Sequence, residues 1–382
     1  MNGYKLYKDK IMKTSCPVID IHASWLALNP IHGCPFSCKY CFLNGVNLTS
    51  KKPLELVSPK EAVKSLLNFK FYNKNFPLCL FTSTDIFGTP SNIEYAIKIL
   101  EELYKNNVFN PIIFITKQYI PNYFLDIIDE YEKKSMKFVF MISYSGLNNN
   151  IEIGINKEKI KQNFINLKNR NKKIIHYWRP FLPENSTEEV LEDVYNFIKK
   201  YANCSISIGL KVQPSYIGNL NFWEKLFNEK ENAYSYESVW TKNAYRFIEK
   251  KKHEDYPIFN TTSCALSCAL TQPDYNAFYR SKFCKSNNCP LFQKELCAKT
   301  KNCLNKKIID DIISKFMKKT NYSFDYSIDL SNNKIIIEKD LKTAEIVYLK
   351  MLTNMIIVCN KSKNDYYWAT TNIANEIMIL EE

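Results

Sequence analysis

The chain has 382 residues, of which 46% are hydrophobic and 24% charged, with 8 Gly and 15 Pro. This composition is typical of a globular protein and excludes collagen-like, low-complexity and wholly disordered chains. Lys and Arg number 52 against 39 Asp and Glu, and the net charge of +13 favours an acidic partner such as a nucleic acid, unless the basic residues are evenly spread.

The thirteen cysteines are interpreted as reduced thiols of a cytoplasmic protein. Residues 1–13 are polar and charged, and no apolar secretion signal follows them, so disulfides are not expected. No apolar run approaches the roughly 20 residues that a membrane-spanning helix needs. The cysteines therefore call for another explanation, and metal binding is the leading one.

Between residue 25 and about residue 227, short apolar runs alternate with amphipathic stretches, which predicts alternating strands and helices. Six strands are expected, at residues 25–29, 78–83, 111–116, 138–143, 173–178 and 205–212. Helices are expected after capping boxes that begin at Ser58, Ser91 and Ser186, and also at residues 122–134, 157–169 and 221–227. Periodicity alone leaves two arrangements open, a doubly wound sheet and an incomplete barrel.

After about residue 231 this alternation is expected to stop. Six of the thirteen cysteines fall between Cys264 and Cys303, in a segment without a strong strand or helix pattern. A basic amphipathic helix is predicted at residues 306–319 and a hairpin at residues 327–338. The chain is thus divided into an α/β core at 1–230, a cysteine-rich segment at 231–305 and a small α/β appendage at 306–382.

Three cysteines lie together directly after the first predicted strand. They are Cys34, Cys38 and Cys41, spaced by three and then two residues. Three thiolates on one short loop can bind three irons of a [4Fe-4S] cluster and leave the fourth iron open for chemistry. The alternatives are a zinc site with His32 as fourth ligand, or plain core thiols.

The spacing Cys-x3-Cys-x2-Cys, with the aromatic Tyr40 before the last cysteine, resembles the cluster loop of the radical S-adenosylmethionine (radical SAM) superfamily. The resemblance covers about residues 25–214. It implies a partial (β/α)6 TIM-like barrel with this loop after the first strand, which decides between the two arrangements. It also implies an oxygen-sensitive enzyme whose open iron binds S-adenosylmethionine. An electron from a donor such as flavodoxin or ferredoxin then cleaves it, and the 5′-deoxyadenosyl radical abstracts hydrogen from a substrate.

Polar residues at the end of the second strand are candidates for binding S-adenosylmethionine, because barrel enzymes place their sites at the C-terminal ends of strands. Where the superfamily often has a Gly-Gly-Glu segment, this chain has Ser83, Thr84 and Asp85. The resemblance makes Asp85 the candidate for an ion pair with the methionyl ammonium, with Ser83 or Thr84 hydrogen-bonding beside it. The alternative for Asp85 is an N-cap of the following helix.

The ends of the next strands supply further candidates. Lys117 and Arg179 are candidates for the methionyl carboxylate or an acidic substrate, with surface salt bridges as the alternative. Ser143 is a candidate for the ribose hydroxyls. His176 lies on an apolar strand and is interpreted as a hydrogen-bonded core imidazole.

Two segments narrow the resemblance further. The run Thr-Ser-Thr-Asp-Ile-Phe-Gly that begins at Thr82, and Ile-Thr-Lys ending at Lys117, are similar to the spore photoproduct lyase branch, which acts on DNA. Two departures speak against the same reaction: that lyase has a cysteine hydrogen donor where this chain has Thr82 and Ser83, and it lacks a cysteine-rich tail. Cys79 is nearby but lies inside an apolar strand, where it is interpreted as a core residue.

For the substrate, the positive charge and these segments favour a nucleic acid or nucleotide. Basic stretches at residues 157–173 and 299–319 are candidate borders of one groove, with solvated helix faces as the alternative. A rival hypothesis is a maturase that modifies a ribosomally made peptide. A second rival is a zinc-bound nucleic-acid-binding module without catalysis.

The second group of cysteines is predicted to bind another metal, which would supply the core that the segment lacks. Its members are Cys264, Cys268, Cys284, Cys289, Cys297 and Cys303. An auxiliary [4Fe-4S] cluster is favoured over structural zinc. Four ligands are needed: Cys284, Cys289 and Cys297 form the nearest set, Cys264 or Cys303 completes it, and Cys268 is either a ligand or a packed thiol.

Overall fold

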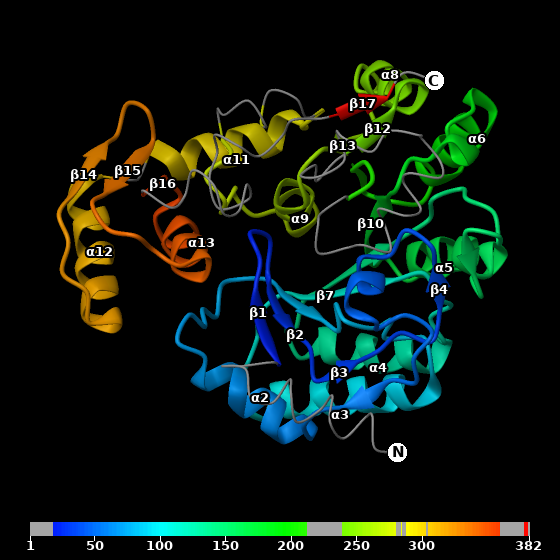
Figure 1. Cartoon of the computed structure of the whole chain (residues 1–382), viewed down its shortest axis with the longest axis horizontal. Helices are drawn as coiled ribbons and strands as arrows, with labels where there is room; N and C mark the ends of the chain where they lie inside the picture. The colour runs from blue at the N-terminus through cyan, green and yellow to red at the C-terminus, as the bar shows by residue number, and fades with distance from the viewer. Residues whose placement is uncertain are drawn as a thin grey trace.

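The computed structural model describes residues 18–211, 239–279, 284, 288–302, 305–359 and 378–380. Its centre is an eight-stranded sheet (Figure 1). In spatial order the strands are β1 Ile19–Ile21, β2 Leu26–Leu28, β6 Leu78–Leu80, β7 Ile112–Thr116, β8 Phe138–Ile142, β10 Lys173–Trp178, β11 Cys204–Ser207 and β13 Ile258–Phe259. Only the edge strand β1 is antiparallel to its neighbour; all other pairs in this described sheet are parallel.

The strand order bears directly on the two arrangements that the sequence leaves open. From β2 to β13, each strand of the sheet lies beside the strand that precedes it in the chain. A doubly wound sheet reverses its strand order at a switch point, whereas (β/α) barrels keep one direction. The protein is therefore an α/β protein with a parallel-rich sheet, and its described strands do not have the doubly wound order.

All six predicted strands form, and two further strands join them. β1 is Ile-Asp-Ile, whose apolar run is interrupted by Asp20, and β13 has only two residues, so neither produces a recognisable apolar run. The expectation that the alternation stops after residue 231 is wrong, because β13 pairs with β11 and extends the sheet. β12 Val239–Thr241 and α8 Lys242–Lys251 precede β13, and β12 pairs with β17 Met378–Leu380. The predicted helix at 221–227 lies outside the described residues.

Helices that follow the strands pack on one side of the sheet, as α2, α3 and α4 show in Figure 1. They are α2 Pro59–Asn68, α3 Pro90–Lys105, α4 Asn122–Lys133, α5 Lys157–Asn169 and α6 Glu188–Ile198. The capping box at Ser58 is confirmed. The other two N-caps are Thr89 rather than Ser91, and Thr187 rather than Ser186. Ser186 donates its hydroxyl hydrogen to the carbonyl of Leu182 instead (2.6 Å).

The opposite face of the sheet is covered by α9 Thr262–Leu270 (Figure 1). Its Ala265, Leu266, Ala269 and Leu270 join a buried cluster with inward side chains of the sheet. Those side chains include Ala27, Cys79, Ile113, Val139, Met141, Ile175, Cys204, Ile206 and Phe259. The sequence does not reveal this helix because it is apolar on nearly every side, and such a helix has no amphipathic period. Cys79 is confirmed as a core residue.

The C-terminal part contains a second, smaller α/β unit. A three-stranded sheet of β14 Tyr326–Asp329, β15 Lys334–Ile337 and β16 Ile356–Val358 packs with α12 Lys306–Thr320 and α13 Thr343–Thr353. The predicted amphipathic helix and hairpin are both confirmed. α11 Leu291–Asn302 precedes this unit. No helix in the described part of the chain is long and apolar enough to cross a membrane.

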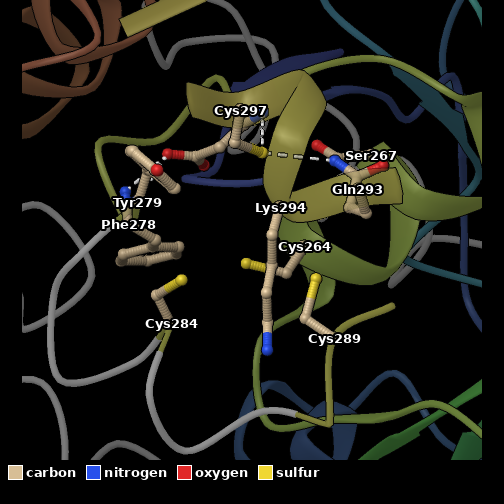
Figure 2. A pocket seen from close by; sticks show the side chains of 10 residues that line it. Cys264, Ser267, Phe278, Tyr279, Cys284, Cys289, Gln293, Lys294 and Cys297 are labelled. Carbon is tan, nitrogen blue, oxygen red and sulfur yellow. Dashed lines mark hydrogen bonds between the residues drawn. The ribbon is translucent and has the colours of Figure 1, made fainter. Parts of the chain in front are cut away.

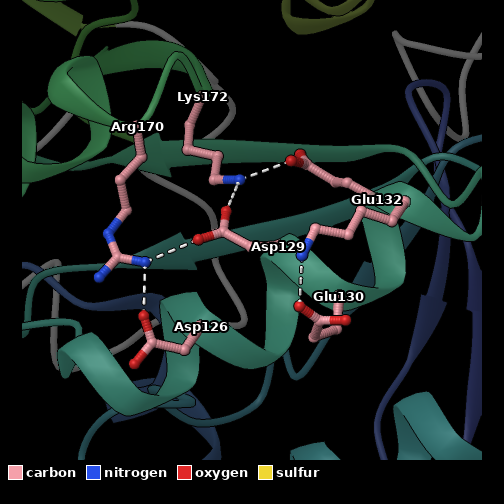
Figure 3. Close-up of polar contacts among 7 residues, drawn as sticks. Asp126, Asp129, Glu130, Glu132, Arg170 and Lys172 are labelled. Atoms are coloured by element: carbon pink, nitrogen blue, oxygen red, sulfur yellow. Dashed lines mark hydrogen bonds and ion pairs between the residues drawn. The ribbon is translucent and has the colours of Figure 1, made fainter.

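Part of the basic stretch at 157–173 is used inside the fold. Figure 3 shows Arg170 and Lys172 reaching α4. The Arg170 guanidinium lies 2.7 Å from both Asp126 and Asp129. The Lys172 ammonium, only 2% exposed, pairs with Asp129 and Glu132. These two cations are therefore committed to ion pairs that join α4 to the start of β10.

Candidate functional site

The first cysteine loop is attached to the ends of two strands of the main sheet. It follows β3 Ile31–His32, which pairs with β5 Leu54–Glu55, and it is followed by the 3-10 helix Phe42–Val46. The Gly33 backbone N–H donates to the Ser83 carbonyl, just after β6 (3.1 Å). Within the loop, β4 Ser37–Cys38 pairs with β9 Glu152–Ile153, which lies after β8. The loop thus lies at the C-terminal edge of the parallel strands.

The three cysteines of this loop are buried to different extents: Cys38 is buried, and Cys34 and Cys41 are half-buried. Burial raises the pKa of Cys34, Cys38 and Cys41 to about 12 each. Each thiolate would also raise the pKa of another member of the set, so the sulfurs share one electrostatic environment. Such thiols stay protonated at neutral pH unless a cation compensates the charge, and the irons of a cluster are cations of this kind.

The arrangement of the three thiols can also be compared with the arrangement of ligands that a single metal ion requires. Among the described residues, no three His, Cys, Asp or Glu side chains converge on one ion. The thiolates of a [4Fe-4S] cluster each bind a different iron, so they need not converge on one point. Three thiols on one loop therefore fit a cluster with an open iron in donor type and number.

Asp85 joins the ends of β6 and β7 beside this loop. Its carboxylate accepts hydrogen bonds from the Thr116 hydroxyl (2.7 Å), the Lys117 backbone N–H (2.9 Å) and the Phe87 backbone N–H (3.0 Å). Burial raises the pKa of Asp85, and its negative charge helps to raise that of Cys34. The N-cap alternative for Asp85 is wrong, because Thr89 caps α3.

The side chains of Lys117 and Tyr40 both bond to the carboxylate of Glu152, a residue that the sequence analysis did not single out. The Lys117 ammonium lies 2.7 Å from Glu152 Oε1, and the Tyr40 hydroxyl donates to the same oxygen. The Glu152 side chain is 3% exposed and that of Lys117 16%. The signal that could have revealed Glu152 is a single acid between Ile151 and Ile153, in the loop after the fourth predicted strand.

Arg179 completes the charged set around the loop. Its guanidinium donates to the Tyr177 hydroxyl (3.0 Å) and lies 5.5 Å from the centre of that ring. Its positive charge lowers the pKa of Cys41, which places it near the thiols. Ser143 is buried, and its backbone N–H donates to the Thr116 carbonyl (2.9 Å). The structure therefore gathers Tyr40, Lys117 and Arg179 at the cysteine loop.

Two predicted polar residues serve the core. The buried Thr84 hydroxyl accepts a hydrogen bond from the Asn92 amide of α3 (3.3 Å). His176 is fully buried, and its two ring nitrogens bond to the Ser205 hydroxyl (2.9 Å) and the Tyr144 carbonyl (2.8 Å). Burial lowers the pKa of His176 to about 3. The prediction of a hydrogen-bonded core imidazole is confirmed.

Four cysteines of the second group line one pocket (Figure 2). They are Cys264, Cys284, Cys289 and Cys297. Cys264 comes from α9 and Cys297 from α11, so the pocket connects the helix that covers the sheet with the next helix. Cys268 does not line this pocket, and Cys303 lies outside the described residues.

The environment of Cys297 is polar although the residue is buried. Its sulfur accepts hydrogen bonds from the Asp274 backbone N–H (3.2 Å) and the Gln293 side-chain amide (3.3 Å). The Asp274 carboxylate in turn accepts from the backbone N–H groups of Phe278 (2.7 Å) and Tyr279 (3.0 Å), which also line the pocket. N–H donors aimed at a cysteine sulfur stabilise a thiolate ligand.

No protein-family model and no curated protein matches the chain. Among solved structures, it is similar to a spore photoproduct lyase mutant with a dinucleoside spore photoproduct, at 14% identity and a TM-score of 0.39. That match covers 60% of this chain and 61% of the lyase, so the chain spans about three fifths of the lyase's length.

Two further solved structures are similar to the chain. Streptococcus suis SuiB bound to S-adenosylmethionine has 13% identity and a TM-score of 0.38, over 73% of this chain and 68% of that one. A radical SAM methyltransferase from Sphaerobacter thermophilus has 12% identity and a TM-score of 0.36, over 56% and 66%. Since these scores are low, the function is argued below from the chain's own residues.

Proposed function

We propose that the protein is a radical SAM enzyme with a partial barrel, and that Cys34, Cys38 and Cys41 hold its catalytic [4Fe-4S] cluster. The carrying observation is that these three thiols, with Cys38 buried and the other two half-buried, share one electrostatic environment on a loop at the C-terminal edge of a parallel sheet with barrel-like strand order. When bound, the cluster supplies the reductive cleavage of S-adenosylmethionine to a 5′-deoxyadenosyl radical, with an electron from a flavodoxin- or ferredoxin-type donor.

The chain's own residues would bind and orient the cofactor. Asp85 is positioned by three hydrogen bonds next to Cys34, which suits a carboxylate that receives the methionyl ammonium. Lys117 and Arg179 are candidates for the methionyl carboxylate or an acidic substrate, and the Lys117 ammonium is also paired with Glu152. Ser83 and Ser143 remain candidates for polar contacts at the strand ends.

The second pocket is proposed to hold an auxiliary [4Fe-4S] cluster on Cys264, Cys284, Cys289 and Cys297. Four thiols around one pocket fit the ligand number of such a cluster, and the two N–H donors to Cys297 suit a thiolate. A zinc ion with the same four ligands is the alternative, and it would require these side chains to move closer together, because no three His, Cys, Asp or Glu side chains among the described residues converge on one ion. Cys268 is assigned as a packed thiol because, unlike the other four, it does not line the pocket.

The favoured substrate is a nucleic acid or a nucleotide. The support is the net charge of +13 and the cationic Arg179 beside the cysteine loop. If this is correct, DNA or RNA is retained by the protein in a strongly salt-dependent way. Retention that hardly depends on salt, or tight binding of a precursor peptide, would contradict the nucleic-acid hypothesis.

The decisive experiment compares the anaerobically reconstituted protein with a variant in which Cys34, Cys38 and Cys41 are changed to Ala. The parent is expected to contain iron as [4Fe-4S] and to form 5′-deoxyadenosine from S-adenosylmethionine and dithionite. The variant is expected to form none and to keep about half the iron by Mössbauer spectroscopy. An iron-free variant would contradict the auxiliary cluster, and a colourless parent that binds zinc would contradict the enzyme itself.

A further inference from the structure

A buried ion pair contacts the first cysteine loop from the side of the sheet. The Lys117 ammonium and the Glu152 carboxylate lie 2.7 Å apart, and the Tyr40 hydroxyl bonds to the same carboxylate. Lys117 Nζ also lies 5.6 Å from the centre of the Tyr40 ring. Removing two charges from water is costly, and well-packed apolar side chains would often stabilise a protein as much. Stability alone therefore does not account for this pair.

The backbone holds both charges in register with the thiols. In the β4–β9 ladder, Glu152 is the direct partner of Cys38. The Lys39 backbone N–H also donates to the Ile151 carbonyl (3.1 Å). The Lys117 backbone N–H is bonded to Asp85 (2.9 Å). Neither charge can move far from the loop without breaking these bonds.

We propose that the Glu152–Lys117 pair sets the reduction potential of the cluster held by the first cysteine loop, with Lys117 raising it and Glu152 lowering it. This inference rests on the proposed function. Reduction adds one electron, supplied by a low-potential flavodoxin- or ferredoxin-type donor, and no other group changes its charge. A nearby cation favours the added negative charge and a nearby carboxylate opposes it.

The two charges act on the same loop. Glu152 faces Cys38 across the β4–β9 ladder, and the Lys117 ammonium lies on the Glu152 carboxylate and 5.6 Å from the centre of the Tyr40 ring. The site is largely removed from water, where such charges interact more strongly than at the surface. Lys117 and Glu152 thus shift the reduction potential of the cluster in opposite directions, and the potential depends on the balance between the two charges.

The test is a redox titration of the reconstituted full chain by electron paramagnetic resonance, without S-adenosylmethionine. Glu152→Gln is expected to shift the potential of the first cluster in the positive direction, and Lys117→Gln in the negative direction. The double variant is expected to return close to the parent value, because both charges are gone. The signal of the second site, recorded on the triple alanine variant of the first loop, is subtracted.

Two controls separate charge from packing. Lys117→Arg keeps the charge and is expected to leave the potential close to that of the parent. Glu158→Gln removes a carboxylate whose ion pair with Lys161 is exposed on α5, and it is expected to cause no shift. If Glu152→Gln does not retain iron, Lys117→Gln compared with Lys117→Arg still decides the question.

Several results would overturn the inference. One is that Glu152→Gln and Lys117→Gln both shift the potential in the same direction. Another is that neither of them shifts the potential more than Glu158→Gln does. The third is that the Gln and Arg variants of Lys117 shift it equally. A parent protein without any cluster signal would instead contradict the proposed function. The failure of one proposal can therefore be told from the failure of the other.

Discussion

Asn354 connects the small C-terminal unit to the loop that lines the second cysteine pocket. Its side-chain oxygen accepts from the Ala277 backbone N–H (2.6 Å), and its amide donates to the Asp274 carbonyl (2.8 Å). All three residues are buried. Asn354 also ends α13 in the left-handed region, with φ 48°. Asn354→Gly therefore removes the two hydrogen bonds and keeps a residue that tolerates this backbone conformation.

The expected cost follows from the two groups that lose their partner. Each buried backbone group left without a hydrogen bond costs about 1–3 kcal/mol, so the loop at residues 274–279 is destabilised by about 2–6 kcal/mol. With 1.4 kcal/mol for each factor of ten, amides of this loop exchange with deuterium at least about 30-fold faster. Hydrogen exchange with mass spectrometry on the full chain measures this change.

Asn321→Gly is the matched control. Asn321 ends α12 with φ 56° in the same left-handed region, but it is exposed. The control is expected to leave exchange in the 274–279 loop unchanged. If both variants give the same exchange rates in that loop, the link between the C-terminal unit and the pocket does not stabilise it, and the reasoning is refuted.

Three further predictions concern the second pocket, the ion-pair network and the core histidine. Cys264→Ala is expected to lose the metal of the second site and Cys268→Ala to keep it; equal metal contents in the two variants would exclude the ligand assignment. Lys172→Met should lower the free energy of unfolding by about 1–3 kcal/mol, because it removes the cation shared by two half-buried carboxylates. Lys133→Met removes a cation from an exposed ion pair and should match the parent in thermal denaturation. His176 has a pKa of about 3 in the native state and about 6.5 in the unfolded state, so between these values only the unfolded state binds the proton. The free energy of unfolding therefore falls by about 1.4 kcal/mol for each pH unit as the pH drops through this window. His176→Gln should weaken this pH dependence in denaturation curves.

The fold could be predicted wherever local pattern and burial coincide. β6, β7 and β8 are buried almost throughout, and such strands appear in a sequence as continuous apolar runs. The order of those strands, in contrast, required the structure, because periodicity does not report which strands are neighbours. The helix α9 was missed for a related reason. It has apolar contacts on nearly every side, so the segment with Cys264 and Cys268 showed no helical period.

The cysteine loop of the candidate site could be located from the sequence, whereas the partners of its charged residues could not. Cysteine spacing is a local property, and it identified the loop without any knowledge of the fold. The role of a charge depends on its partner, and the partner of Lys117 lies 35 positions away in the chain. In the sequence, Lys117 is a candidate either for binding a carboxylate ligand or for a salt bridge, and its neighbours in the chain do not decide between them. In the structure its charge is compensated by Glu152, a partner that no local pattern could have indicated.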